Sequence, residues 1–184
     1  NLCGNRFISK QTLCAPIASA LHKGWKPAKI GAQNTEKGRK MPPKTPSTEH
    51  NLNRNAPCPC GSQQPLQHCC LDFIEGTRLP PTAESLMRSR YTAHGLGAID
   101  YLWNSWSPEQ RIRSSKSDVR AWAENCDWLG LQILDTRAGG PTDEQGVVEF
   151  VAIFRQQGQV HQHHEVSLFK KSLGKWLYVD HLNE

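Results

Sequence analysis

The segment GVVEFVAIFRQQGQVHQHHEVSLFKK, residues 146–171, decides the fold, because it holds two strand-like runs separated by one glycine. Both runs are rich in β-branched and aromatic residues, a composition typical of strands. Two similar runs flank this pair: WLGLQILDT at residues 128–136 and KWLYVDHL at residues 175–182. The sequence therefore predicts four strands in hairpin order. Glycines mark the turns between them: Gly139, Gly140, Gly158 and Gly174.

The residues before these strands, 82–126, have helical periodicity. Thr82 is a suitable helix cap, and Ser107, which is followed by a proline, marks a second helix start. Gly95 and Gly97 are expected to break the first helical segment into two helices. Two apolar stripes recur at i, i+3, i+4 and i+7. Their members are Ile99, Leu102, Trp103 and Trp106, then Val119, Trp122, Ala123 and Cys126.

Helices followed by an antiparallel meander predict an α+β fold in which a curved sheet wraps the helices. Breakers in EGTRLPPT place the start of this cone-shaped domain near residue 78, so the domain spans residues 78–184. The tryptophans are interpreted as core residues because of their helical and strand spacing, with a ligand cage as the alternative. They are Trp103, Trp106, Trp122, Trp128 and Trp176.

Charge divides the chain, since residues 1–57 carry ten Lys or Arg against two acidic residues, and residues 58–184 carry twelve against fifteen. Residues 1–55 are expected to form a disordered basic tail, and nucleic-acid binding is a weak hypothesis that rests on this tail alone. Met41 is a plausible natural start, which would make residues 1–40 an extension. A secretory or organellar signal around residues 13–21 is an alternative, and no run is long enough to span a membrane.

The most informative local motif is APCPCGSQQPLQHCCLDF, in which four cysteines follow the pattern C-x-C-x8-C-C. Adjacent cysteines bridge each other only with strain, and other pairings would close very short loops, so disulfides are disfavoured. Four thiolates satisfy a tetrahedral zinc ion and leave no open position for a substrate, which favours a structural site over a catalytic cysteine. The predicted ligands of this zinc knuckle, residues 56–76, are Cys58, Cys60, Cys69 and Cys70.

Two neighbours of these cysteines affect the prediction. His68 stands beside Cys69 and is the alternative ligand, although we favour four cysteines because zinc accepts both imidazole and thiolate. Gly61 is expected to adopt a left-handed backbone conformation that turns the loop around the metal.

The motif CPCGSQQPLQHCC resembles the SEC-C zinc motif, which also occurs at the end of the preprotein translocase ATPase. The segments LMRSRYTAH, DYLWNSW, WLGLQIL and HHEVSLFKKSLGKWLYVD resemble the bacterial YchJ family, from about Asn55 to His181. The resemblance implies a nuclear transport factor 2-like, or cystatin-like, cone after the knuckle. It also implies the same four cysteine ligands.

The chain departs from this family in ways that concern its partner. In the translocase, a basic knuckle contacts an acidic chaperone and the ribosome, but here no Lys or Arg lies between Cys58 and Cys70. That partner assignment therefore transfers poorly to this neutral knuckle. Many family members also carry a second C-terminal knuckle, whereas this sequence ends soon after YVDHLNE.

A cone could also enclose a pocket. On the third strand, His163 and Glu165 share one face with two-residue spacing, so they could form a general base with its orienting carboxylate. The competing interpretation is a solvated face or a buried polar network in which Arg88 pairs with Glu165 and Tyr91 satisfies a carbonyl. The candidate pocket residues are Arg88, Tyr91, Glu149, His163, Glu165 and Tyr178.

These observations favour a cytoplasmic, zinc-binding accessory protein that is not an enzyme. Its knuckle would contact a protein or the ribosome, and its cone would offer a ligand pocket or a homodimer surface. The first alternative is an isomerase or hydratase for a small hydrophobic substrate, using His163 and Glu165. The second is a nucleic-acid adaptor that uses the basic tail.

Overall fold

A four-stranded antiparallel sheet forms the largest part of the computed structural model, which describes residues 52–182. The strands follow the order β1-β2-β3-β4, so each pairs with its neighbour in sequence. The four predicted strands and their hairpin order are confirmed. Their bounds are β1 (Asp127–Ala138), β2 (Gln145–Gln156), β3 (Gln159–Ser172) and β4 (Lys175–His181).

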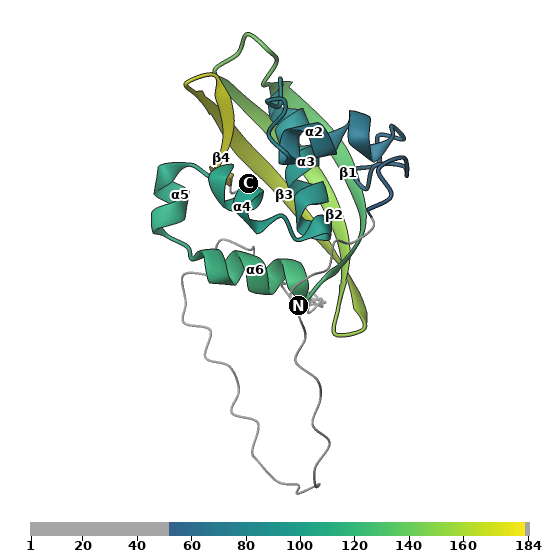
Figure 1. The fold of residues 1–184 in the computed structure, drawn as a ribbon. Coiled ribbons are helices and arrows are strands. Elements are labelled where there is room, and N and C mark those ends of the chain that lie inside the picture. The colour runs from purple at the N-terminus through teal and green to yellow at the C-terminus, as the bar shows by residue number, and fades with distance from the viewer. Residues whose placement is uncertain (1–51, 183–184) are drawn as a thin grey trace, which may run out of the picture.

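The helices precede the sheet in the chain and lie against one of its faces (Figure 1). This arrangement confirms the predicted α+β class. The elements are η1 (Leu66–His68), α2 (Cys70–Ile74), α3 (Ala83–Leu96), α4 (Ile99–Asn104), α5 (Pro108–Ile112) and α6 (Lys116–Glu124).

Helix α3 is the central helix and packs along the inner face of the sheet (Figure 1). Thr82 caps it as predicted, since its side chain accepts from the Ser85 N–H at 3.0 Å. The predicted interruption occurs at Gly97, which adopts φ +65° at the C-cap, while Gly95 stays within the helix. The start of α3 is also fixed to the β1–β2 hairpin, because the Ala83 N–H donates to the Gly139 carbonyl at 2.9 Å.

The second helical segment is two helices rather than one. Ser107 caps α5 as predicted, but Ser115 starts a new helix by accepting from the Asp118 N–H at 3.1 Å. Both serines satisfy amides that have no partner inside the helix. Helix α6 ends at Glu124, so Cys126 of the predicted stripe lies between α6 and β1.

The core fills the space between the sheet and the helices. Phe169 and Tyr91 are 0% and 2% exposed, and Leu86 and Leu102 are similarly buried. The tryptophan interpretation holds for Trp106 and Trp176, at 7% and 3% exposed. The inner sheet face is therefore closed by side chains of α3, α4 and α6.

The predicted tail, with Met41, falls outside the described residues except for its last four positions. Those four belong to the knuckle, since the Gln67 N–H donates to the Arg54 carbonyl at 2.9 Å and Arg54 pairs with Glu75 at 2.7 Å. Leu52 packs on the cysteine cluster. Within residues 52–182, no helix has the length and apolar character needed to cross a bilayer.

Candidate metal centre

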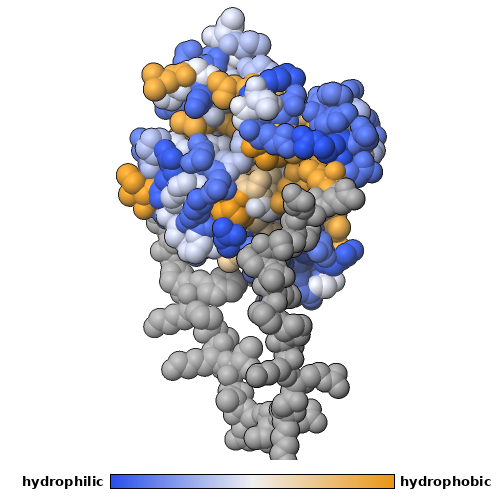
Figure 2. Space-filling view, viewed as in Figure 1, coloured by the Kyte–Doolittle hydropathy of each residue, from blue (hydrophilic) through white to orange (hydrophobic). Residues whose placement is uncertain are grey.

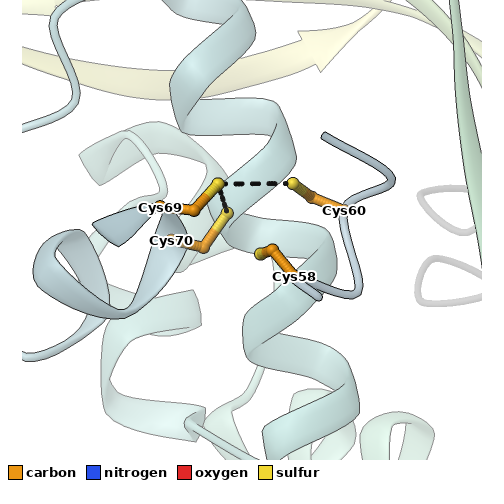
Figure 3. Close-up of side chains that lie close together, drawn as sticks. All are labelled: Cys58, Cys60, Cys69 and Cys70. Atoms are coloured by element: carbon orange, nitrogen blue, oxygen red, sulfur yellow. Dashed lines mark hydrogen bonds between the residues drawn. The ribbon is translucent and has the colours of Figure 1, made fainter. Parts of the chain in front are cut away.

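The sulfur atoms of Cys58, Cys60, Cys69 and Cys70 converge, all lying within 4.8 Å of one another. Two of them come from the loop before η1 and two from the start of α2, and the side chains point toward one another (Figure 3). Cys60 Sγ lies 3.6 Å from Cys69 Sγ, which in turn lies 3.8 Å from Cys70 Sγ. The described cysteines are therefore free thiols rather than disulfides.

These distances fit a tetrahedral metal ion. A zinc ion with Zn–S bonds of about 2.3 Å would space its four sulfurs by about 3.8 Å. Three of the thiols are almost fully buried, with Cys58, Cys60 and Cys70 at 4%, 0% and 1% exposed, while Cys69 is half-buried. Four polarisable ligands in one buried cluster are a donor set that could hold a metal ion.

Backbone hydrogen bonds shape the loop that presents the first two thiols. The Cys58 N–H donates to the Gln64 carbonyl at 2.8 Å, and the Gly61 N–H donates to the Cys58 carbonyl at 3.1 Å. Gly61 has φ +79°, the left-handed conformation that was expected from the sequence. The turn folds the chain back so that both sulfurs face α2.

The thiols perturb one another. Hydrogen bonds with Cys60 and Cys70 lower the pKa of Cys58, whereas hydrogen bonds with Cys58 and Cys60 raise the pKa of Cys70. Burial raises the pKa of Cys69 to about 11. Without a cation, the cluster therefore holds its protons unevenly. A divalent metal ion would allow all four sulfurs to ionise.

His68 lies outside this cluster. Its side chain is exposed, and its Nε2 lies 3.2 Å from Gln67 Nε2 rather than beside a sulfur. The group of residues able to hold a metal among residues 52–182 consists of the four cysteines alone.

The cone packs directly on the metal centre through α3 and β1. Arg88 Nη1 donates to the Cys60 carbonyl at 2.8 Å, and Thr92 Oγ1 lies 3.6 Å from Cys58 Sγ. Leu131 of β1 packs on the same cysteine cluster. Sequence reasoning missed Thr92, because a threonine inside a helix carries no local signal that a thiol lies opposite it.

The structure separates the six candidate pocket residues into different places. Arg88 lies at the knuckle, where its Nε also pairs with Glu84 at 2.7 Å. Tyr91 packs in the core, edge-on to Trp128 with ring centroids 5.5 Å apart. Glu149 bonds to His164 Nε2 at 2.7 Å, on the outer face of the sheet.

The other three form a buried network on the inner face. Glu165 accepts from His163 Nε2 at 2.9 Å and from the Tyr178 hydroxyl at 3.1 Å, and it also accepts from Ser167. Burial alone would raise the pKa of Glu165, but hydrogen bonds from His163 and Ser167 outweigh it and leave this pKa lowered. Glu165 is thus held as a carboxylate inside the cone.

Arg90 completes this network in place of Arg88. Its guanidinium carbon lies 4.9 Å from the centre of the Tyr178 ring, and its Nη1 donates to the Leu102 carbonyl at 3.1 Å. Arg90 is 7% exposed, so Tyr178 stands between a buried cation and the Glu165 carboxylate. Sequence spacing favoured neither arginine, because both lie on α3.

A hollow of about 250 Å³ lies at a different place, where the end of α2 meets the turn between α3 and α4. None of the six candidate pocket residues lines it. Its lining residues are Ile74, Gly97, Ala98, Ile99, Asp100, Tyr101 and Arg120.

The aromatic residues near β1 form a packed cluster with His94. The His94 ring stacks on Trp128 at 4.7 Å and contacts Trp122 edge-on at 4.6 Å. Burial and the charge of Arg90 lower the pKa of His94 well below its ordinary value. Because the rings contact one another, the cluster is packing rather than an open cage.

Comparison with known proteins agrees with this geometry. The SEC-C motif matches residues 54–72, and the middle NTF2-like domain of YchJ matches residues 82–181. A UPF0225 protein of Geobacter sulfurreducens is 42% identical over 123 residues, which are 67% of this chain and 76% of that protein. A UPF0225 protein of Chromobacterium violaceum is 41% identical over 69% of this chain and 93% of its own.

Two solved structures share the arrangement. A SEC-C motif-containing protein from Rhodopseudomonas palustris superposes with a TM-score of 0.64 at 36% identity, over 70% of this chain and 99% of the other. One from Psychrobacter arcticus gives 0.61 at 27% identity, over 70% and 83% of the two chains. A SEC-C motif joined to an NTF2-like domain, with these relatives, shows that the chain belongs to the YchJ-like UPF0225 family.

Proposed function

We propose that this protein is a zinc-binding accessory protein in which a structural zinc ion holds the SEC-C knuckle in a shape that contacts a protein partner. The observation that carries the proposal is the convergence of four thiols within 4.8 Å. A closed set of four thiolates suits a structural ion, because no coordination position is left for a substrate. Iron also accepts four thiolates, so the metal must be identified by measurement.

The exposed surface of the knuckle supports a polar partner of low charge. Figure 2 shows this region, on the right of the view, as largely hydrophilic. Its basic residue Arg54 is already paired with Glu75, with both Nη atoms on the carboxylate at 2.9 and 2.7 Å. Such a surface suits a protein interface better than ribosomal RNA, for which unpaired Lys and Arg would be required. The exposed residues include Asn55, Gln63, Gln64 and His68.

The four thiols also indicate the compartment. A thiolate site requires reduced cysteines, which reducing compartments maintain and oxidising ones do not. We therefore place the protein in the cytoplasm as part of the same proposal.

Metal analysis tests this proposal directly. The full chain, purified in reducing buffer, should contain about one zinc and no iron per molecule. A chelator that removes the metal should expose four titratable thiols beyond those of the metal-loaded chain. Substoichiometric zinc after incubation with excess zinc, with free thiols throughout, would overturn the proposal.

A second candidate function, an isomerase or hydratase of the cone, is favoured by one contact. His163 Nε2 lies 2.9 Å from Glu165, so the carboxylate orients the imidazole as it would in a general base. Stability separates this candidate from a purely structural network, because catalytic polar groups commonly lower stability. Glu165→Gln should destabilise a structural network, whereas a gain in stability would favour catalysis.

A further inference from the structure

One face of α3 is devoted to the metal centre. Arg88, Thr92 and Leu96 recur at i, i+4 and i+8, which places them on one side of the helix. Arg88 and Thr92 contact the cysteine loop, and Leu96 packs on the cysteine cluster. Other faces of the helix carry Arg90 and Tyr91 into the cone. Helix α3 therefore joins the two parts of the molecule.

Thr92 places its hydroxyl against a ligand sulfur. Its side chain is 0% exposed, and Oγ1 lies 3.6 Å from Cys58 Sγ. A metal-bound thiolate carries no proton, so the threonine must be the donor in this contact. A buried hydroxyl needs a partner, and this sulfur is the partner that the described residues give it.

Arg88 fixes the backbone of a second ligand. Its Nη1 donates to the Cys60 carbonyl at 2.8 Å, and its Nε donates to Glu84 Oε1 at 2.7 Å. The Glu84 contact lies one helical turn away and holds the guanidinium in place. The Cys60 carbonyl precedes Gly61, the left-handed turn residue, so Arg88 acts on the bend that aims both loop sulfurs.

We propose that Thr92 and Arg88 are positioning residues of the metal site, through which the cone sets the metal affinity of the knuckle. The inference rests on the proposed zinc function and extends it. Hydrogen bonds to metal ligands typically change metal affinity roughly 10- to 100-fold. The coupling is reciprocal, because a contact that strengthens metal binding also makes bound metal stabilise α3.

The experiment compares full-length Thr92→Val and Thr92→Ser with the wild type. Valine keeps the shape of threonine and removes the donor, while serine keeps the hydroxyl. We expect Thr92→Val to bind zinc roughly 10- to 100-fold more weakly in competition with a chelator. The sulfur-to-cobalt charge-transfer band of the Co²⁺-loaded variant should also shift. Thr92→Ser should restore both values toward those of the wild type.

Ser89→Ala is the matched control. Ser89 is a fully buried hydroxyl on the same helix, but it contacts the Tyr101 hydroxyl at 2.6 Å instead of a cysteine. This variant should lose stability without any change in the cobalt band. Equal band shifts in Ser89→Ala and Thr92→Val would show general loosening of α3 and would overturn the inference.

The outcomes separate the two proposals. A wild-type chain that binds no metal refutes the proposed function, whereas one zinc per chain with unchanged affinity and spectrum in Thr92→Val refutes only this inference. If Thr92→Val does not fold, Arg88→Met carries the test, since methionine keeps an apolar stem but cannot donate to Cys60. An unchanged zinc affinity in folded Arg88→Met then overturns the inference.

Discussion

The knuckle and the cone are built by different physical means. The buried cluster of the knuckle contains Cys58, Cys60, Leu66, Cys70 and Leu71, so most of its interior is sulfur. The buried cluster of the cone has sixteen residues and includes aromatic side chains from helices and strands. Apolar burial can therefore support the cone, while the knuckle needs an additional source of stability such as a metal ion.

The two parts meet on one helix, which changes what independence means here. Helix α3 contributes Tyr91 to the core of the cone and Thr92 to the edge of the metal centre. Sequence neighbours thus serve different parts of the molecule. A change in either part is expected to reach the other through α3, with a size that depends on which face of the helix is altered.

The largest expected effect comes from removing two metal ligands. Cys58→Ser/Cys60→Ser should reduce zinc from about one ion per chain to almost none, because structural zinc sites contribute about 10–16 kcal/mol of apparent binding free energy. Hydrogen exchange should then show lost protection in residues 52–76, partial loss in α3 and retained protection in β2 and β3.

Cys126→Ala is the control for that pair, since Cys126 is a buried thiol outside the metal cluster. Its zinc content should match that of the wild type. Retained protection in the metal-free knuckle would mean that the metal is not what holds this region together.

The cone is tested next by a cavity. Phe169 is 0% exposed and packs edge-on against Tyr178, with ring centroids 5.8 Å apart. Phe169→Ala should lower the free energy of unfolding by about 3–5 kcal/mol, measured by urea denaturation with tryptophan fluorescence. Leu173→Ala, at a fully exposed turn position, should stay within about 0.5 kcal/mol of the wild type. A similar loss in both variants would contradict the assigned core.

Much of this architecture could be predicted from periodicity. The strand runs, the cap at Thr82 and the cap at Ser107 were readable because each depends on local composition or on a short capping pattern. The new start at Ser115 was missed because the apolar stripe continues past it. Gly95 was wrongly expected to end the first helix, since a glycine inside a helix is tolerated at a modest cost.

The candidate metal ligands were also readable, because all four lie within thirteen residues and need no tertiary information. The buried network was only partly readable. Strand alternation placed His163 and Glu165 together, but nothing local identifies Arg90 rather than Arg88 as the inward arginine. That choice depends on the rotation of α3 against the sheet, which tertiary packing decides.

A smaller, pH-dependent effect is expected from His94, whose Nδ1 is buried without a hydrogen-bond partner. Its pKa is lowered in the folded state, so below about pH 6.5 the unfolded chain binds a proton that the folded chain does not. Stability should be fully present above that pH and should fall as the pH drops below it.

His94→Phe tests this effect, since it keeps an aromatic contact with Trp122 and Trp128 but cannot titrate. The variant should lose less stability between pH 7 and 5.5 than the wild type. Protonation of the metal ligands affects both chains alike, so the difference reports on His94. Parallel pH curves would argue against a buried neutral imidazole.

The finest test compares two threonines on one helix. Thr82 caps α3 and lies at the β1–β2 hairpin, whereas Thr92 faces Cys58. Thr82→Ala should lower the free energy of unfolding by about 1 kcal/mol, because Ser85 N–H loses its acceptor. It should leave zinc affinity unchanged, since the cap lies more than one helical turn before Arg88. Chelator competition and urea denaturation on the same samples measure both quantities. A weakened zinc affinity in Thr82→Ala would mean that α3 transmits any loosening to the metal, and the division of the helix into a cone face and a metal face would then fail.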